Sequence, residues 1–92
     1  MSTRQPSEAQ MFNRMNAGHA KVLRRRADGQ RDTLPSDSAG DARGLLTARR
    51  TLLAWGAVDM AGGVTELGRR LLERWDARER DRLEARRRAF GV

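Results

Sequence analysis

The chain has 92 residues, of which 19 are lysine or arginine and 12 are aspartate or glutamate, so its formal net charge is +7 at pH 7. This length suits one small domain, and this positive charge favours acidic partners, of which nucleic acid is the commonest. The absence of cysteine excludes disulfides, thiolate metal sites and a cysteine nucleophile.

The first eight residues are polar, and we expect residues 1–8 to form a flexible N-terminal arm. A first helix is expected from Ser7 to Ala27, where Ser7 and Gln10 have the spacing of a capping box. Its apolar face, at helical spacings of three and four, comprises Met11, Phe12, Met15, His19, Val22 and Leu23. Three consecutive arginines, Arg24, Arg25 and Arg26, close this helix, and their charge suits the negative end of the helix dipole.

Residues 28–40 are rich in turn-forming residues. A second helix is expected from Asp41 to Trp55, either continuous or broken near Gly44. On a helical wheel one arc comprises Leu45, Leu46, Leu52 and Leu53, and the opposite arc comprises Arg43, Thr47, Arg50 and Ala54. Arg49 falls within the apolar arc. We expect its side chain either to extend to solvent or to pair with a carboxylate such as Asp59 or Glu66.

The stretch GAVDMAGGVTELGRRLL, residues 56–72, predicts a helix end, a short β-hairpin and a new helix in quick succession. Gly56 suits the position just past a helix C-terminus, and Thr65 is a good N-cap for the next helix. Ala57 to Asp59 and Val64 are expected to form two short strands, with Val58 facing inward and Gly62-Gly63 in the turn. The helix after Thr65 has an apolar face of Leu67, Leu71, Leu72 and Trp75, and its Gly68 allows close backbone approach.

Residues 76–88, the main part of an expected tail over residues 76–92, are almost wholly charged. Opposite charges recur at spacings of three and four, in the pairs Asp76–Arg80, Glu79–Arg82 and Glu84–Arg88. This pattern predicts a solvent-exposed helical tail. Leu83 and Phe90 continue a sparse apolar stripe from Trp75, so a helix that joins two copies of the chain as a homodimer remains an alternative.

Residues 56–72 resemble the wing and following helix of winged helix-turn-helix DNA-binding domains. The resemblance rests on Leu52 four residues before Gly56, the short strand, the Gly62-Gly63 wing and the TELGR helix start at residues 65–69, and it is specific from Leu45 to Trp75. It implies a mainly α domain with a small two-stranded β-wing over residues 9–75, followed by a charged helix. The structural positions of that fold are Leu45, Leu52, Gly56, Val58, Gly62, Gly63, Thr65, Leu67, Gly68 and Leu71.

The resemblance also implies binding of double-stranded DNA, with Asp41–Trp55 as a recognition helix in the major groove. The side chains facing the groove are then Arg43, Thr47, Arg50 and Thr51, because an arginine there can reach guanine O6 and N7 with both ends of its guanidinium. Phosphate contacts, which fix register, are expected from Arg24, Arg25, Arg26, Arg69 and Arg70. The expected function is that of a small transcriptional regulator, of a kind common among phage and mobile-element products.

Two departures from the family pattern favour another function. The segment before the second helix is short and broken by glycine where the family has a distinct middle helix, and the wing tip has no arginine or lysine. Both favour a non-enzymatic inhibitor or adaptor that binds an acidic or nucleic-acid-binding protein complex, such as a phage anti-defence protein of the anti-CRISPR kind. A third alternative is non-specific coating of nucleic acid through the charged tail.

Patterns typical of enzymes and metal sites are missing from the sequence. His19, the only histidine, lies on the apolar face of the first helix, where we expect it to be packed and hydrogen-bonded. Asp37 and Asp41 flank Gly40, but one carboxylate pair in a loop does not make a metal site. We therefore expect no catalysis, no cofactor and no metal. No apolar run approaches the roughly 20 residues that span a bilayer, and no secretory signal begins the chain, so we expect a cytoplasmic protein.

Overall fold

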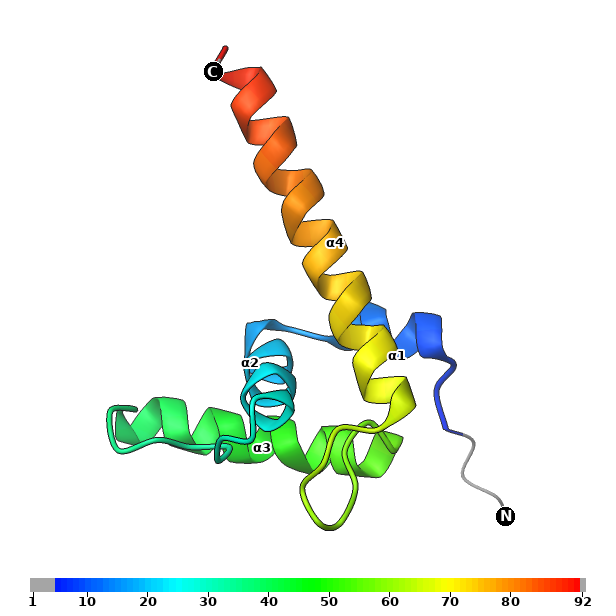
Figure 1. Cartoon of the computed structure of the whole chain (residues 1–92), viewed down its shortest axis with the longest axis vertical. Helices are drawn as coiled ribbons and strands as arrows, with labels where there is room; N and C mark the ends of the chain where they lie inside the picture. The colour runs from blue at the N-terminus through cyan, green and yellow to red at the C-terminus, as the bar shows by residue number, and fades with distance from the viewer. Residues whose placement is uncertain (1–4, 92) are drawn as a thin grey trace.

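The computed structural model describes residues 5–91, which form four helices (Figure 1). They are α1 (Glu8–Arg14), α2 (Ala17–Ala27), α3 (Ala39–Trp55) and α4 (Glu66–Ala89). Residues 1–4 of the expected arm lie outside the described residues. The rest of that segment contacts the domain, since the Gln5 side-chain amide donates to the Ala54 carbonyl at 2.9 Å and Ser7 caps α1.

The expected first helix is divided into α1 and α2, and Asn16 is the cause. Its side chain accepts hydrogen bonds from the backbone N–H groups of Gly18 and His19, while His19 Nδ1 accepts from the Asn16 N–H at 3.0 Å. This reciprocal capping box starts a new helix within the apolar pattern. The Ser7–Gln10 capping box that starts α1 is confirmed.

The second expected helix is confirmed as one continuous helix, α3, and Gly44 does not break it. It begins two residues before Asp41 because the Ser38 hydroxyl accepts from the Asp41 N–H and caps the helix. It ends at Trp55, and the C-cap Gly56 has a φ of 79°, which lies in the left-handed region that glycine tolerates best. Residues 28–38 contain no helix, so a middle helix is absent from this part of the chain.

The expected two-stranded β-wing is wrong. Within residues 5–91 there is no strand, and the segment between α3 and α4 has a single antiparallel β-bridge between Val58 and Val64. The return strand has no room, because Thr65 directly after Val64 already caps α4 through its hydroxyl. Asp59 closes the loop on itself, with its carboxylate accepting from the Gly63 N–H at 2.8 Å and its backbone pairing with the Gly63 carbonyl. The mainly α fold class remains, without the wing.

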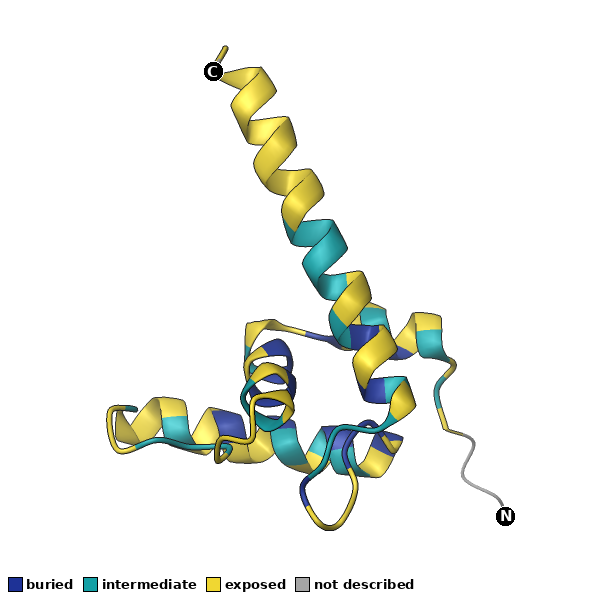
Figure 2. Ribbon diagram, viewed as in Figure 1, coloured by how far each residue is buried: buried dark blue, intermediate teal, exposed yellow. Residues whose placement is uncertain are grey.

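The core lies where α2 crosses α3 and where the first half of α4 packs against α1 and α2 (Figure 2). Its largest fully buried side chains come from three helices and are Val22, Leu23, Leu52 and Leu71. Burial of each such side chain stabilises the fold by about 1.5–3 kcal/mol. Val58 is also buried, as expected, whereas Leu46, placed in the apolar arc of α3, is 46% exposed.

The long helix α4 leaves the core midway along its length. Its first half covers the domain, with Leu71 buried and Trp75 half-buried. Residues 80–91 are all exposed, and Figures 1 and 2 show this half of α4 projecting away from the other helices. The charged segment is thus helical, as expected, and is continuous with the helix that begins at Glu66.

Candidate nucleic-acid interface

The exposed side of α3, opposite the side that packs on α2, is the surface that the sequence singled out. Arg43, Thr47, Arg50 and Ala54 are all exposed there and follow one another at spacings of four, three and four. Arg43 and Arg50 are seven residues apart, which places them about 10 Å apart along the helix axis on one face. The small Thr47 lies between them, so both arginines can approach a flat or concave partner together.

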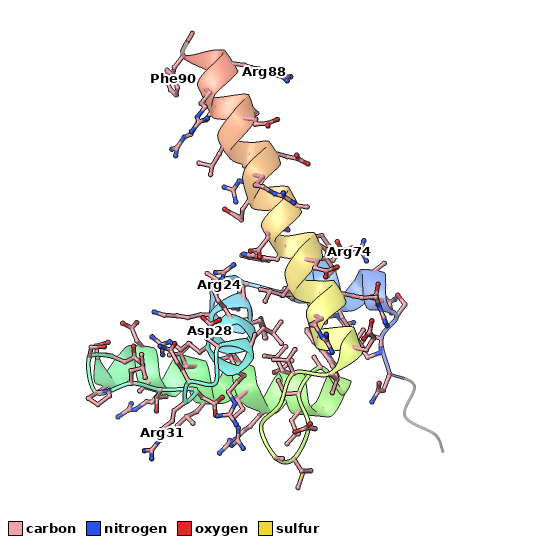
Figure 3. The ribbon with its side chains drawn as sticks, in the orientation of Figure 1. Arg24, Asp28, Arg31, Arg74, Arg88 and Phe90 are labelled. Carbon is pink, nitrogen blue, oxygen red and sulfur yellow. The ribbon has the colours of Figure 1, made fainter. Side chains whose placement is uncertain are left out.

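Neither Arg43 nor Arg50 has a carboxylate within ion-pair distance among residues 5–91, although nine ion pairs occur there. Arg31, in the connection between α2 and α3, is also exposed and unpaired within this range. Figure 3 shows Arg31 pointing past α3, away from α2. We call Arg31, Arg43 and Arg50 the α3 arginine face. The sequence pattern did not single out Arg31 as a binding residue, although it is the only basic residue of the 28–40 connection.

The hydroxyl groups of Thr47 and Thr51, which lie beside the α3 arginine face, already donate hydrogen bonds to backbone carbonyls of α3. Thr47 donates to the Arg43 carbonyl at 3.1 Å, and Thr51 donates to the Thr47 carbonyl at 3.3 Å. Thr51 is also half-buried. Thr47 therefore presents an oxygen acceptor and a methyl group to a partner, while Thr51 lies at the edge of the face.

The three arginines at the end of α2 are bound to other parts of the protein. Arg24 pairs with Asp76 of α4 at an exposed position (Figure 3). Arg26 donates through Nε to the Gly62 carbonyl at 2.6 Å, which fastens the loop before α4 to α2. Gly62 is itself buried under that guanidinium, and its φ is +88°. In this structure Arg24 and Arg26 thus hold the helices and the loop together.

Arg25 forms the most buried ion pair of the described chain. Its two terminal nitrogens donate to the two Asp37 carboxylate oxygens at 2.8 and 2.9 Å, and Asp37 also accepts from the Leu34 N–H. The hydrogen bond from Arg25, then that from Leu34, hold the pKa of Asp37 far below its usual value, and the same pair raises the pKa of Arg25. This pairing orders the connection that leads into α3.

The remaining expected phosphate contacts lie at the start of α4. Arg70 pairs with Glu8 of α1 at 2.7 Å, which raises the pKa of Arg70, and it also approaches Glu66. Arg69 is exposed and lies 3.9 Å from Glu66. The structure therefore does not bring Arg69 and Arg70 together with the α3 arginine face.

Two further arginines, Arg49 and Arg78, make contacts whose partners the sequence did not predict. Arg49 pairs with a carboxylate, which was one of the two expected alternatives, but the partner is Asp32 at 3.0 Å and is neither Asp59 nor Glu66. Arg78 stacks on Phe12 and Trp75, with its guanidinium carbon 5.0 and 4.4 Å from the ring centres. These cation–π contacts join α1 to α4 near the point where α4 leaves the core.

His19 is packed and hydrogen-bonded, as expected. It is buried, stacks on Trp55 with ring centres 5.5 Å apart, and accepts the Asn16 N–H through Nδ1. Burial lowers its pKa. These contacts give it a structural role in joining α2 to α3.

Comparison with protein-family models, with curated proteins and with solved structures found no match to this chain. Of the helices between residues 5 and 91, none is both long enough and apolar enough to cross a membrane. The same residues contain no group of three or more metal-ligating side chains.

Proposed function

We propose that this protein binds double-stranded DNA through α3 and acts as a small, non-enzymatic transcriptional regulator in the cytoplasm. The observation that supports this most directly is the distribution of ion pairs. The arginines of α2, and Arg70 of α4, are bound to carboxylates or backbone oxygens of the protein, whereas Arg31, Arg43 and Arg50 are exposed without such partners in the described chain.

The shape and chemistry of α3 fit a groove of DNA. A single helix fills the major groove, and the fork of an arginine matches the two acceptors of guanine. Arg43 and Arg50 are two helical turns apart on one side of α3, with small side chains at Thr47 and Ala54 beside them. Arg31, outside the helix, is exposed and points past α3 on the side away from α2 (Figure 3), which suits a phosphate contact.

The test is fluorescence anisotropy with two duplexes, one from the region upstream of the gene and one of scrambled sequence, over about 50–200 mM salt. A regulator prefers the upstream duplex at the higher salt. Replacing Arg43 and Arg50 together by alanine should abolish that preference. Replacing Arg14 and Arg88 together by alanine removes the same charge from exposed positions away from α3. This control should leave the preference for the upstream duplex intact.

The other outcomes identify the alternatives. Equal affinity for both duplexes, lost equally in the two double variants and steeply with salt, would indicate non-specific coating of nucleic acid. Absence of binding to either duplex would instead favour the inhibitor or adaptor function, in which the same arginines contact an acidic protein.

A further inference from the structure

A regular stripe that the DNA-binding proposal does not use runs along α4, from the half that packs on the core into the half that projects from it. Its positions repeat at spacings of four and three, as in a coiled coil, and they are Leu72, Asp76, Glu79, Leu83, Arg86 and Phe90. Leu83 is 56% exposed and Phe90 76% exposed. With Arg86 and Arg87 they line a shallow hollow of about 230 Å³. Such exposed apolar side chains on an isolated helix fit a helical partner.

We propose that α4 pairs with α4 of a second copy of this chain in antiparallel orientation. In an antiparallel coiled coil, the two kinds of stripe position face each other. Aligning Glu79 with Leu83 of the second copy places Leu72 opposite Phe90 and Asp76 opposite Arg86. In this register the outer layers pair two apolar side chains, and the next layers pair an acid with a base. The central layers pair Glu79 with Leu83.

The charges beside the stripe favour the same register. Glu73 falls opposite Arg87 of the second copy, and both are exposed with no ion pair within the described chain. Near the two-fold axis Arg80 and Arg82 of one copy approach the same residues of the other copy. Glu79 of each copy lies next to Arg80 and Arg82 of the other, and its negative charge offsets that repulsion. A parallel pairing would instead place Glu79 against Glu79 and Arg86 against Arg86, which is unfavourable.

Two acidic side chains of the stripe have partners within their own chain: Glu79 accepts from Arg82 through Oε1 at 3.2 Å, and Asp76 pairs with Arg24. Arg24 uses only Oδ1 of Asp76, so Oδ2 remains to accept from Arg86 of the second copy. Leu72 is half-buried at the edge of the core, where its exposed part would meet Phe90. This pairing does not depend on the proposed binding of DNA.

Sedimentation of the full-length chain over a wide concentration range tests the pairing. We expect a reversible dimer. Arg87→Glu should weaken dimerisation roughly tenfold, because two symmetry-related attractions become repulsions. Glu73→Arg combined with Arg87→Glu should restore it. Arg88→Glu makes the same charge change on the opposite side of α4 and should have little effect. A monomer at all concentrations, or failure of the double exchange to restore the dimer while circular dichroism shows the native helix content, overturns the proposal.

Cross-linking distinguishes the orientation, since the natural chain has no cysteine. Arg80 lies beside the two-fold axis of the antiparallel pair, so Arg80→Cys should form a disulfide-linked dimer on oxidation. Residue 91 of each copy lies about 30 Å from its counterpart in that register, so Gly91→Cys should not. Cross-linking of Gly91→Cys and not of Arg80→Cys would show a parallel pair and overturn the antiparallel register.

Discussion

The carbonyl oxygen of Ala57 occupies the space that a side chain on Gly68 would need. An ideal Cβ on Gly68 lies 2.1 Å from that oxygen and 2.8 Å from a methyl carbon of Val64. Gly68 therefore lets the first turn of α4 pack directly on the backbone of the loop that follows α3. The close approach expected from the sequence is thus confirmed, and it fixes where α4 leaves the core.

Gly68→Ala should lower the free energy of unfolding by about 3 kcal/mol, because the clash is with backbone that cannot rotate away. Gly44→Ala is the matched control, since a Cβ at this position of α3 meets nothing within 4 Å. The control should raise the free energy of unfolding by about 0.5–1 kcal/mol through helix propensity. Urea titration of both variants measures the two changes. Equal effects of the two substitutions would show that Gly68 is not in close contact.

The Arg25–Asp37 pair predicts a loss of stability in acid. The pKa of Asp37 is lowered in the folded protein, so the folded state binds fewer protons than the unfolded state wherever the unfolded carboxyl titrates. Its contribution to stability is complete above about pH 5 and falls as the pH drops through about 4 and below. Asp37→Asn should be less stable than the natural chain at pH 7, and the difference should shrink toward pH 3. Melting temperatures across this range provide the test, and a difference independent of pH would contradict the assignment.

Local signals in the sequence were enough for the helix ends that depend on a few neighbouring residues. Ser7 with Gln10, Gly56 and Thr65 each cap a helix where their residue types indicated. Asn16 carries the same kind of capping signal, but the apolar spacing continues across it and predicts a single helix. The β-wing failed for a different reason. A Gly-Gly turn between valines is typical of a hairpin, but the Thr65 cap ends the return segment after a single bridge.

The roles of the arginines could not be predicted from the sequence, because their partners are distant along the chain. Arg25 pairs across 12 positions, Arg24 across 52 and Arg70 across 62. A run of three arginines at a helix end is typical of a phosphate site. In the folded chain these arginines instead bind Asp37, Asp76 and the Gly62 carbonyl. The outward position of Arg43 and Arg50 was predictable, because helical periodicity alone determines it.

His19 predicts a second pH effect, nearer neutrality. Its Nδ1 accepts the Asn16 N–H, and burial lowers its pKa, so protonation favours the unfolded state. The melting temperature should therefore fall as the pH drops below about 6.5. His19→Gln keeps a side-chain acceptor for the cap, as Gln10 does in α1, but cannot titrate. This variant should have a flatter melting profile between about pH 7.5 and 5.5, whereas Asp37→Asn should keep the natural slope there. An unchanged slope in His19→Gln would assign the effect to another group.

Arg50 is the sharpest test of base contact on α3. Arg50→Ala should weaken binding to the preferred duplex by about 1–3 kcal/mol and relax the preference at one base position. Arg50→Lys keeps the charge but loses the fork, so it should behave like alanine if Arg50 contacts guanine and like the natural chain if it contacts only phosphate. Arg14→Ala removes an exposed arginine of α1 that has no ion pair among residues 5–91, and it serves as the control. Anisotropy titrations against the duplex and its single-base variants provide the comparison. Affinity for the preferred duplex that is unchanged in Arg50→Ala would exclude this residue from the interface.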